Sequence, residues 1–447
     1  MIPPVRLKIA VVGTGISGLS AAWMLHPRHD VVVYETADRI GGHANTVQVS
    51  LDGDPQPIDT GFIVYNPLTY PNFVALLRVL DVKSEVSDMS FAVSLDQGGF
   101  EYAGSNHLSG LFAQRSNLLR PSFWRMLGDL ARFYREAPRH ARDVGGDEMT
   151  LGDYLAQNRY GAAFRDRHIL PMASAIWSAA PTDILSYPAA AFIRFHENHG
   201  LLRLLGRPIW RTVTGGSREY VRQMARPLAG RIRTGAPVAR IERLAGKATV
   251  IEARGERETF DHVIVATHAD EALALLGDVS PAERALLGAF RYSRNLAVLH
   301  TDESLMPRRR AAWSSWNYVG GSDAPDQVSV TYWMNKLQNL RTATNVFVTL
   351  NPARPPREGS ALRVETYDHP LFDAAAVSAQ KRLWSLQGAR NTWFCGAHFG
   401  SGFHEDGLQA GLAVAEQLGG VRRPWSVAGE SSRIWLSAAP AERDAAA

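Results

Sequence analysis

The sequence predicts an α/β fold with two interleaved domains, one built on a parallel sheet and one of mixed α+β structure. Three observations predict this fold. An apolar strand near the N-terminus runs into a glycine-rich turn and a helix, at residues 9–20, IAVVGTGISGLS. Residues 391–418 repeat the order of strand, glycine-rich loop and helix. Related strand segments lie between them, so the parallel-sheet domain must be assembled from separate stretches of chain.

The first glycine-rich turn has the spacing that holds a pyrophosphate. Gly13, Gly15 and Gly18 form G-x-G-x-x-G after a short, β-branched strand. These glycines allow a tight turn, close approach of a phosphate to the backbone, and packing of the helix on the strand. The helix N-terminus adds free N–H groups and a positive dipole. The motif in this context predicts a Rossmann-like dinucleotide site.

The next segment distinguishes between dinucleotides. A second strand ends at Glu35, whose carboxylate can accept hydrogen bonds from ribose hydroxyls and disfavours the 2′-phosphate of NADP. Gly41 and Gly42 then offer a second glycine turn, which a nicotinamide domain does not need. Near the C-terminus, Asp406 is placed to cap a helix whose N-terminus can face a flavin. The sequence therefore predicts FAD.

The order of these elements resembles the flavin-containing amine oxidase superfamily, which includes monoamine oxidase, protoporphyrinogen oxidase and phytoene desaturase. The matching segments span essentially the whole chain: VVGTGISGL, YETADRIGG, TGGSREYV, PVARI, FDHVIVATHADEAL and the C-terminal flavin segment. The resemblance implies a two-domain flavoprotein fold of the amine oxidase and p-hydroxybenzoate hydroxylase type.

Longer motifs give a narrower resemblance. They resemble bacterial FAD-binding proteins associated with cyclopropane-fatty-acid-synthase-like methyltransferases, and the N-terminal flavin domain of plant cyclopropane fatty-acid synthases. The motifs include IGGHANT, IDTGFIVYNPLTYPNF, AAWSSWNY, TYWMNKLQNL and GSGFHEDGLQAG. For some bacterial members the resemblance implies desaturation of methyl-branched phospholipid acyl chains on the way to furan fatty acids.

Two departures from the superfamily affect the expected site. His43 stands where the superfamily usually has an arginine near the pyrophosphate, and Cys395 precedes the loop instead of occupying the position that bonds flavin covalently in monoamine oxidases. We therefore expect non-covalent FAD. The predicted cofactor-binding residues are Gly13, Thr14, Gly15, Ile16, Ser17, Gly18, Glu35, Thr36, Arg39, Gly41, Gly42, His43, Gly61, Phe62, Val238, Thr267, Gly396, Glu405, Asp406 and Leu408.

The positions of the flavin motifs predict the domain boundaries. The FAD-binding domain is expected at 1–85, 205–285 and 385–425, the substrate domain at 86–204 and 286–384, and a partly disordered tail at 426–447. Within the substrate domain, residues 86–204 have mainly helical periodicity, and residues 286–384 have the pattern typical of strands. Together they are expected to form a flat pocket over the flavin ring.

Candidate substrate and catalytic residues lie in these inserts and beside the flavin motifs. Five aromatic residues suit the walls of an apolar pocket, although any one of them is equally consistent with an ordinary core. They are Trp313, Trp316, Tyr318, Tyr332 and Trp333. The catalytic candidates are His404, Tyr65 and His196, each of which is also compatible with a structural role.

Two further features give little support for a functional role. The motif FHENHG at 195–200 lacks the spacing of a metal site, so no metal is expected. Lys336 differs in context from the flavin-proximal lysine that the resemblance to amine oxidases would imply.

The segment 115–142 combines helical apolar spacing with an excess of arginine. Phe123, Leu127, Leu130 and Tyr134 fall on one face, and Pro138 is expected to end or kink the helix. Seven arginines accompany only two acidic residues. This pattern fits a core-packed helix with a solvated basic side, or a helix lying on anionic phospholipid.

Composition limits the remaining possibilities. The net charge of +4 is too dispersed to indicate nucleic-acid binding. A single cysteine excludes an intramolecular disulfide and fits a reducing compartment. No stretch is long and apolar enough to span a bilayer, and the N-terminus lacks the pattern of a secretory signal. We expect a cytoplasmic protein with peripheral contact at the inner face of the membrane.

Three functions remain open from the sequence. The leading one is FAD-dependent desaturation of a fatty acyl chain, methyl-branched and phospholipid-bound. The second is oxidation of an amine or a polyene. The third is a non-catalytic flavoprotein that accompanies a cyclopropane-synthase-like methyltransferase.

Overall fold

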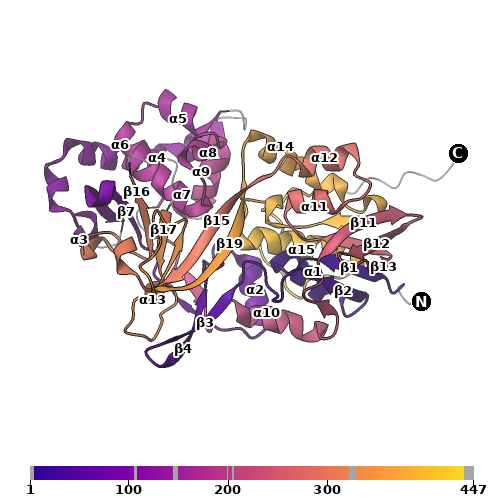
Figure 1. Cartoon of the computed structure of the whole chain (residues 1–447). Helices are drawn as coiled ribbons and strands as arrows, with labels where there is room; N and C mark the ends of the chain where they lie inside the picture. The colour runs from indigo at the N-terminus through magenta and orange to yellow at the C-terminus, as the bar shows by residue number, and fades with distance from the viewer. Residues whose placement is uncertain are drawn as a thin grey trace. The chain divides into compact units, whose positions relative to one another are not determined.

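The computed structural model describes residues 5–104, 108–143, 149–198, 200–203, 206–321 and 329–436 (Figure 1). By their internal contacts they form two compact units. Unit 1 comprises Met1–Gly42, Gln223–Phe290 and Ala375–Ala447, and unit 2 comprises His43–Arg222 and Arg291–Ala374. The predicted two-domain α/β fold is confirmed. Residues 43–85 and 205–222, which we expected with the FAD-binding domain, group with unit 2.

Unit 1 is built on a parallel sheet of five strands in the order β10-β2-β1-β14-β20. Ile9, Ala10 and Val11 of the central strand are fully buried, as expected where both faces of a parallel sheet are covered. The strands are β10 (Ile232–Arg233), β2 (Asp30–Tyr34), β1 (Lys8–Val12), β14 (His262–Val265) and β20 (Thr392–Phe394).

Two helices of unit 1 pack unusually closely. A Cβ atom on Gly411 of α15 (His404–Gly419) would lie 2.2 Å from the carbonyl oxygen of Ser17 in α1 (Ile16–Leu25), so only glycine allows this contact. The remaining elements are α10 (Arg218–Ala225), which straddles the unit boundary, β11 (Val238–Leu244), β12 (Lys247–Glu252), β13 (Arg257–Phe260), α11 (Ala269–Leu275), α12 (Pro281–Leu287) and α14 (Ala374–Leu383).

The start of the expected tail is ordered by specific contacts. Ile434 is buried, and the Nε atom of Arg433 donates to Oδ1 of Asp406 at 2.5 Å. Residues 426–436 therefore belong to the packed part of unit 1. Residues 437–447 lie outside the described residues.

Unit 2 contains a seven-stranded sheet in the order β19-β15-β18-β17-β16-β7-β8, in which only β16 and β7 pair in parallel. The strands are β19 (Ala361–Leu371), β15 (Arg291–His300), β18 (Phe347–Leu350), β17 (Ser329–Trp333), β16 (Trp316–Gly320), β7 (Phe91–Leu95) and β8 (Phe100–Gly104). Two smaller sheets pair β3 (Thr46–Leu51) with β4 (Asp54–Asp59), and β5 (Val64–Tyr65) with β9 (Arg211–Val213) and β6 (Ser84–Val86).

A layer of helices covers one face of this sheet. Phe123 of α4 (Pro121–Asp143) contacts Phe100 and Tyr102 of β8, with ring centroids 6.1 Å apart in both pairs. The fully buried residues of α4 are Phe123, Met126, Phe133 and Ala137, whereas Leu127, Leu130 and Tyr134 of the predicted face are half-buried. The helix continues through Pro138, so it does not end at that proline. The other helices of unit 2 are α2 (Pro71–Val79), α3 (Leu108–Leu111), α5 (Leu151–Gln157), α6 (Ala162–Phe164), α7 (Leu170–Trp177), α8 (Pro181–Leu185), α9 (Ala189–Asn198) and α13 (Met334–Leu337).

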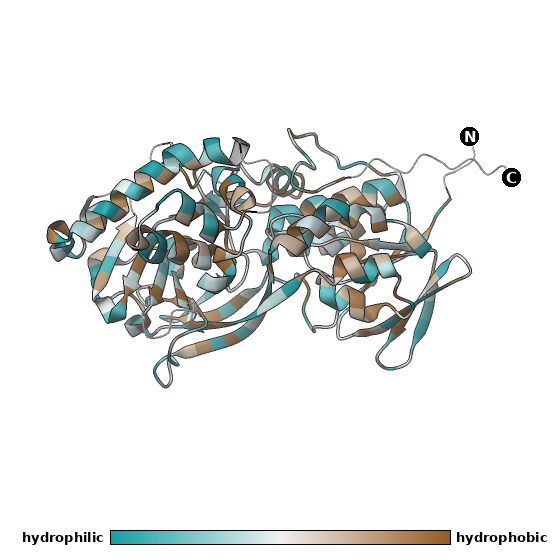
Figure 2. Ribbon diagram, turned by 90° about the horizontal axis from the view of Figure 1, so that it is seen from above, coloured by the Kyte–Doolittle hydropathy of each residue, from teal (hydrophilic) through white to brown (hydrophobic). Residues whose placement is uncertain are grey.

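The hydropathy of the helices and strands varies from residue to residue. Figure 2 shows hydrophilic and hydrophobic residues alternating along the helices and strands. None of the described helices combines the length and the apolar composition that crossing a bilayer requires.

Candidate cofactor and substrate sites

The first glycine turn leaves open space where a phosphate would approach. A Cβ atom on Gly15 would meet no heavy atom within 4 Å, whereas one on Gly18 would lie 2.0 Å from the carbonyl oxygen of Gly13. Gly18 is thus needed for packing, and Gly15 leaves its surroundings free. The N-terminus of α1 has no side-chain cap and no acidic residue in its first turn. Its N–H groups and dipole suit the pyrophosphate of FAD.

The second glycine turn lies against the first. Gly41 and Gly42 have φ angles of 110° and 57°, which favour glycine. A Cβ atom on Gly42 would lie 3.1 Å from the Cα atom of Gly15, and the Gly41 amide donates to the Thr14 carbonyl at 3.2 Å. The guanidinium of Arg39 donates to the Gly42 carbonyl at 2.8 Å. Arg39 therefore supports the turn through its backbone.

Glu35 follows β2 and reaches back to the first turn. Its Oε2 atom accepts from the Thr14 amide at 3.0 Å and from the Thr14 hydroxyl, and its Oε1 atom accepts from the Ala37 amide at 2.9 Å. An ionised carboxylate has about four acceptor sites, so capacity for a ribose hydroxyl remains. The neighbouring Thr36 is exposed.

The N-terminus of α15 carries two fully buried carboxylates. Oδ2 of Asp406 accepts from the Phe403 amide at 2.8 Å, so Asp406 caps the helix from its third position, and Phe403 occupies the N-cap position that the sequence analysis gave to Asp406. Oε1 of Glu405 accepts from Gln409 at 3.0 Å. Burial raises the pKa of Asp406, while Arg433 opposes this shift. Arg433 was not predicted, because it lies in the expected tail.

The histidines of this loop are buried and neutral. Burial lowers the pKa of His404 to about 3, so its imidazole carries no charge near neutral pH. His398 was not predicted; burial also lowers its pKa to about 3, and its Nε2 atom has no hydrogen-bond partner among the described residues. A Cβ atom on Gly396 would lie 2.5 Å from the His398 ring. The first histidine of GAHFGSGFH was the available signal for His398.

Three further predicted residues belong to unit 1. Leu408 is fully buried in α15. The carbonyl oxygen of Thr267, after β14, would be 3.4 Å from a Cβ atom on Gly396, and Val238 begins β11.

Three residues predicted to lie near the flavin come together within unit 2. The Phe62 amide donates to the His43 carbonyl at 2.8 Å, and a Cβ atom on Gly61 would lie 2.3 Å from the same oxygen. The His43 ring packs against Tyr367, with centroids 5.0 Å apart. The hydroxyl of Tyr367 is 2.7 Å from that of Thr60. A side chain at position 61 would collide with the His43 carbonyl oxygen, which explains why this residue is glycine.

A buried carboxylate beside this cluster was missed. Asp59 is 1% exposed and accepts hydrogen bonds from Thr46, Ser217 and Gln338, at 2.6 to 3.1 Å. Burial raises its pKa to about 6. Asp59 joins the DTGF segment to TGGSR and to Gln338, the residue that follows α13. The conspicuous Asp within DTGF was the available signal.

The five predicted aromatic residues do not share one wall. Trp316 and Tyr332 are cross-strand partners with ring centroids 4.9 Å apart, and Tyr318 lies two residues along the same strand. These three therefore share a face of the sheet. Trp333 lies on the opposite face, where its ring contacts Trp313 at 5.4 Å. A single pocket lined by all five was wrong, because successive strand residues point to opposite faces.

The face that carries Trp316 has no charged side chain across its central strands. Cross-strand register places Val93 and Tyr102 on the same face, and Tyr102 packs on α4 of the helical layer. The residues of this face in β7, β16, β17 and β18 are Phe91, Val93, Trp316, Tyr318, Val330, Tyr332, Val348 and Leu350. We call this set the apolar face.

Two catalytic candidates lie in different parts of unit 2. Tyr65 is buried in β5 against Phe73, with centroids 5.0 Å apart. His196 is fully buried in α9, where its Nδ1–H donates to the Phe192 carbonyl at 2.8 Å. Burial lowers the pKa of His196 to about 4. No hydrogen bond or ring contact joins Tyr65 to His196 in the described structure. His199 of the same motif lies outside the described residues.

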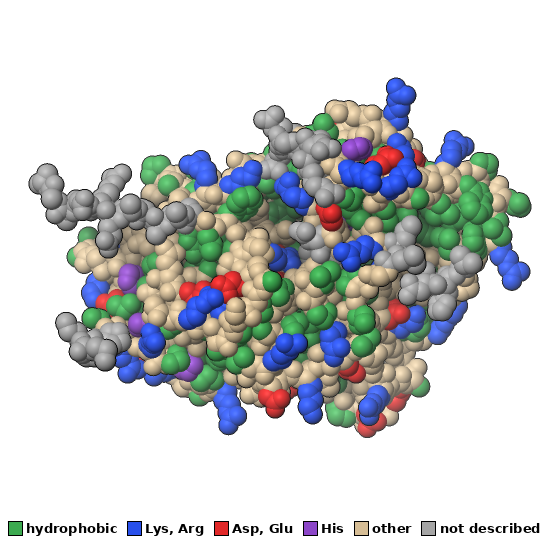
Figure 3. All heavy atoms as spheres, turned by 180° about the vertical axis from the view of Figure 1, so that it is seen from behind, with side chains coloured by type: hydrophobic (Ala, Val, Ile, Leu, Met, Phe, Trp, Pro, Cys, Tyr) green, Lys and Arg blue, Asp and Glu red, His purple; other side chains and the backbone are tan. Residues whose placement is uncertain are grey.

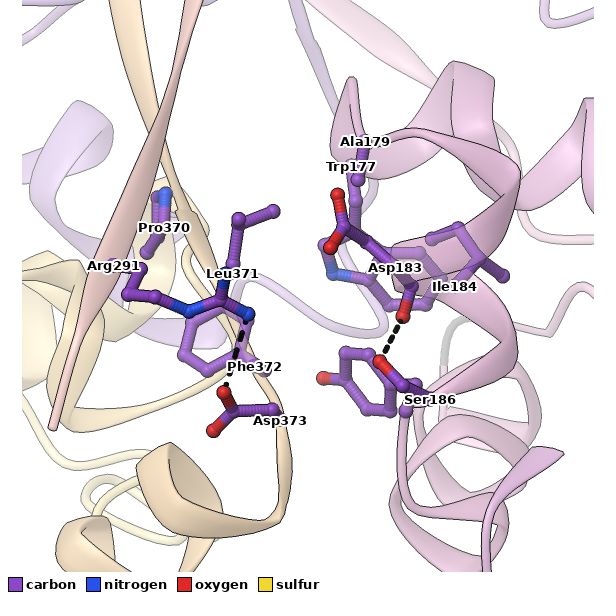
Figure 4. Close-up of a pocket in the computed structure, with 11 residues that line it drawn as sticks. Trp177, Ala179, Asp183, Ile184, Ser186, Arg291, Pro370, Leu371, Phe372 and Asp373 are labelled. Atoms are coloured by element: carbon purple, nitrogen blue, oxygen red, sulfur yellow. Dashed lines mark hydrogen bonds and ion pairs between the residues drawn. The ribbon is translucent and has the colours of Figure 1, made fainter. Parts of the chain in front are cut away.

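One pocket of unit 2 opens where the end of β19 meets α7 and α8 (Figure 4). Its floor is apolar and includes Trp177, Ile184 and Phe372. On its rim, Arg291 pairs with Asp373 at 3.3 Å. No sequence motif pointed to this pocket.

The two contacting glycine turns, the acidic strand end and the buried helix N-terminus define a flavin-dependent oxidoreductase. The sequence model for flavin containing amine oxidoreductases matches residues 16–303, well over half of the chain. The chain belongs to this family, and its cofactor is FAD.

Relatives and solved structures agree with this assignment. AofH of Mycobacterium tuberculosis, assigned by name to the flavin-containing monoamine oxidases, is 26% identical over 85% of this chain and 78% of its own length. Cyclohexylamine oxidase from Brevibacterium oxydans has a TM-score of 0.63 at 17% identity, covering 93% of this chain and 100% of its own. A conjugated-linoleic-acid-producing fatty acid isomerase from P. acnes has a TM-score of 0.60 at 15% identity, covering 92% and 98%. The structural likenesses show the fold alone.

Proposed function

We propose that this oxidoreductase desaturates a fatty acyl chain that is methyl-branched and bound in a phospholipid. The observation that carries the proposal is the apolar face of unit 2. Its eight side chains are aromatic or aliphatic and carry no charge; six are buried, and the half-buried Phe91 and Trp316 leave apolar surface open to a ligand. An acyl chain loses no hydrogen bonds when it leaves water for such a surface.

The reaction removes two hydrogens from adjacent carbons and leaves a double bond. Bound FAD supplies the acceptor for a hydride. The chain must then hold the acyl carbons in place, exclude water and receive the second hydrogen as a proton. A substrate C–H beside a double bond or a methyl-bearing carbon is easier to oxidise. The charge that develops on the reacting carbon is delocalised over the double bond or stabilised by the methyl substituent. An external oxidant, such as oxygen or a quinone, must take the two electrons in a second half-reaction.

The buried histidines suit positioning better than proton transfer. His404 and His196 have pKa values lowered to about 3 and 4 by burial, which makes them weak bases at neutral pH. Tyr65 is buried in a packed aromatic cluster. We propose that His404 tunes or orients the cofactor. A His404→Ala variant should keep FAD and change the rate of flavin reduction; an unchanged rate would leave His404 with a structural role.

Oxidation of an amine is the second candidate, because the relative AofH matches most of the chain. Lys336, the residue closest in sequence to the amine oxidase lysine, lies with its Nζ atom 5.3 Å from the ring of Trp333. Trp333 belongs to the sheet face opposite the apolar face. This placement favours the acyl chain over the amine.

The deciding experiment is anaerobic mixing of the oxidised holoprotein with substrate while the flavin absorbance is followed. One arm uses vesicles with methyl-branched unsaturated chains, a second uses saturated straight-chain vesicles, and a third uses a panel of primary and secondary amines. We expect bleaching with the first arm alone. Bleaching by an amine would replace the proposal with amine oxidation. No bleaching in any arm, with a methyltransferase recovered alongside the protein, would support the non-catalytic partner.

A further inference from the structure

The start of α4 carries an exposed group of large apolar side chains. Leu119 is 87% exposed, Trp124 is 50% exposed and Leu118 is 47% exposed. We call these three residues the apolar tip. Scattered apolar residues are normal on a protein surface, but neighbouring ones mark interaction sites.

The apolar tip is held in place by its own contacts. The indole N–H of Trp124 donates to the Leu118 carbonyl at 2.9 Å. The Trp124 ring packs against Phe112 and the fully buried Phe123, with centroids 6.0 and 6.4 Å apart. This anchoring keeps the three side chains at the surface.

The charged residues on either side of the apolar tip along the chain, from 102 to 128, are all positive. Residues 102–128 contain three arginines and no acidic residue. Arg115 and Arg125 are exposed, and the structure gives neither one an ion pair or hydrogen bond with another described residue. Figure 3 shows hydrophobic side chains gathered between Lys and Arg side chains at the end of unit 2 that carries α3. Apolar side chains flanked by unpaired cations are typical of an interfacial membrane contact.

We propose that the apolar tip inserts into an anionic phospholipid surface. Tryptophan favours the headgroup level of a bilayer, and leucine favours the acyl region beneath it. The long apolar face of α4 is not available for this contact, since Phe123, Met126 and Phe133 are fully buried. Insertion therefore uses the turn before the helix.

Charge argues against a second copy of this chain as the occupant. A two-fold contact through the apolar tip would bring the arginines of both copies together, and the segment offers no acidic partner for them. An anionic bilayer supplies the missing negative charge. This inference does not depend on the acyl substrate, because it concerns binding and not turnover.

The test is co-sedimentation of the holoprotein with sucrose-loaded vesicles. One set is an equimolar mixture of straight-chain phosphatidylcholine and phosphatidylglycerol, and the other is phosphatidylcholine alone. We expect binding to the mixed vesicles, little binding to the neutral ones, and release in high salt. The variant Leu118→Ser/Leu119→Ser should lower the partition coefficient at least about tenfold.

Two matched variants control for apolar area and for charge. Leu362→Ser/Val364→Ser removes exposed apolar side chains from β19 and should bind as the unaltered protein does. Arg115→Gln/Arg125→Gln should weaken binding about tenfold or more. Arg226→Gln/Arg254→Gln makes the same change in net charge at exposed sites elsewhere and should have a smaller effect.

Each variant must retain its flavin absorbance and melting temperature, so that loss of binding is not loss of fold. Equal binding to neutral vesicles, no binding to the mixed vesicles, or full binding by the leucine variant would overturn the proposal. Sedimentation velocity is run on the same samples. A dimer of the unaltered protein that the leucine variant abolishes, without vesicle binding, would assign the apolar tip to a second copy.

Discussion

Replacing Gly15 by alanine should separate folding from cofactor binding. Gly15 has φ −62° and ψ 177°, a conformation that alanine adopts without strain, and its Cβ atom would meet nothing within 4 Å. Alanine also restricts the unfolded chain, which stabilises a compatible site by about 0.4–1 kcal/mol. The flavin-free Gly15→Ala protein should therefore melt at the same temperature as the unaltered flavin-free protein, or slightly above it.

The same substitution should weaken FAD binding. The new methyl group would occupy the space through which the pyrophosphate reaches the backbone N–H groups. Loss of one hydrogen bond to a charged phosphate costs about 1.5–3 kcal/mol. That cost corresponds to an increase in Kd of roughly 10- to 150-fold.

Gly18→Ala is the matched control. Its Cβ atom would lie 2.0 Å from the Gly13 carbonyl oxygen and 3.1 Å from the Cβ atom of Ala266, so the backbone must shift. Overpacking of this kind costs about 1–3 kcal/mol. Unlike Gly15→Ala, this variant should lower the melting temperature of the flavin-free protein.

The assay strips the flavin, titrates FAD back by fluorescence quenching, and measures thermal unfolding of each flavin-free protein. The reasoning is refuted if Gly15→Ala binds FAD with unchanged Kd. It is equally refuted if Gly15→Ala destabilises the flavin-free protein as much as Gly18→Ala does.

Three further predictions concern buried polar groups. The Asp59 pKa of about 6 is raised from 3.8 by burial, so its contribution to stability is complete below pH 3.8 and is lost as pH rises through 6. The stability advantage of the unaltered protein over Asp59→Asn should therefore shrink by about 2.4 kcal/mol between pH 4 and pH 7 in denaturant titrations. Arg433→Ala leaves the fully buried Asp406 without its cation and should cost about 3–5 kcal/mol, measured by chemical unfolding. Cys395 is fully buried and burial raises its thiol pKa, so acid precipitation should release all flavin, from the unaltered protein and from Cys395→Ala alike.

The glycine turns were predictable because their sequence spacing fixes their backbone geometry. G-x-G-x-x-G after a strand allows few conformations, and the structure explains Gly13, Gly18 and Gly42 by positive φ or close contact. The contact between Gly42 and Gly15 was predictable as well, because the two turns follow β1 and β2, which are neighbouring parallel strands.

The buried polar networks were not predictable from local pattern. Asp59 pairs with Ser217 and Gln338, which are 158 and 279 residues further along the chain. Hydrophobic periodicity and turn residues carry no information about such pairs. Arg433 illustrates the same point, because a Ser- and Ala-rich tail gives no local reason to expect an ion pair with Asp406.

The α4 segment shows that amphipathic spacing predicts a covered helix face but does not predict whether protein or lipid covers it. The sequence left the protein core and a lipid surface as alternatives. The structure buries Phe123, Met126 and Phe133 in unit 2, and it exposes Leu119 in the preceding turn. Leu119, which lipid can reach, therefore lies before the helix and outside its apolar repeat.

The aromatic residues give the complementary case, in which a local rule was available and decides which of these side chains share a face of the sheet. Tyr332 and Trp333 are consecutive in a strand, so they must point to opposite faces of the sheet. Trp316 and Tyr318 are two apart and must share a face. What period two does not supply is the register between strands, which pairs Trp316 with Tyr332 and thereby joins three rings into one uncharged surface. That register, more than the number of aromatic residues, is the reason to favour an acyl chain over an amine.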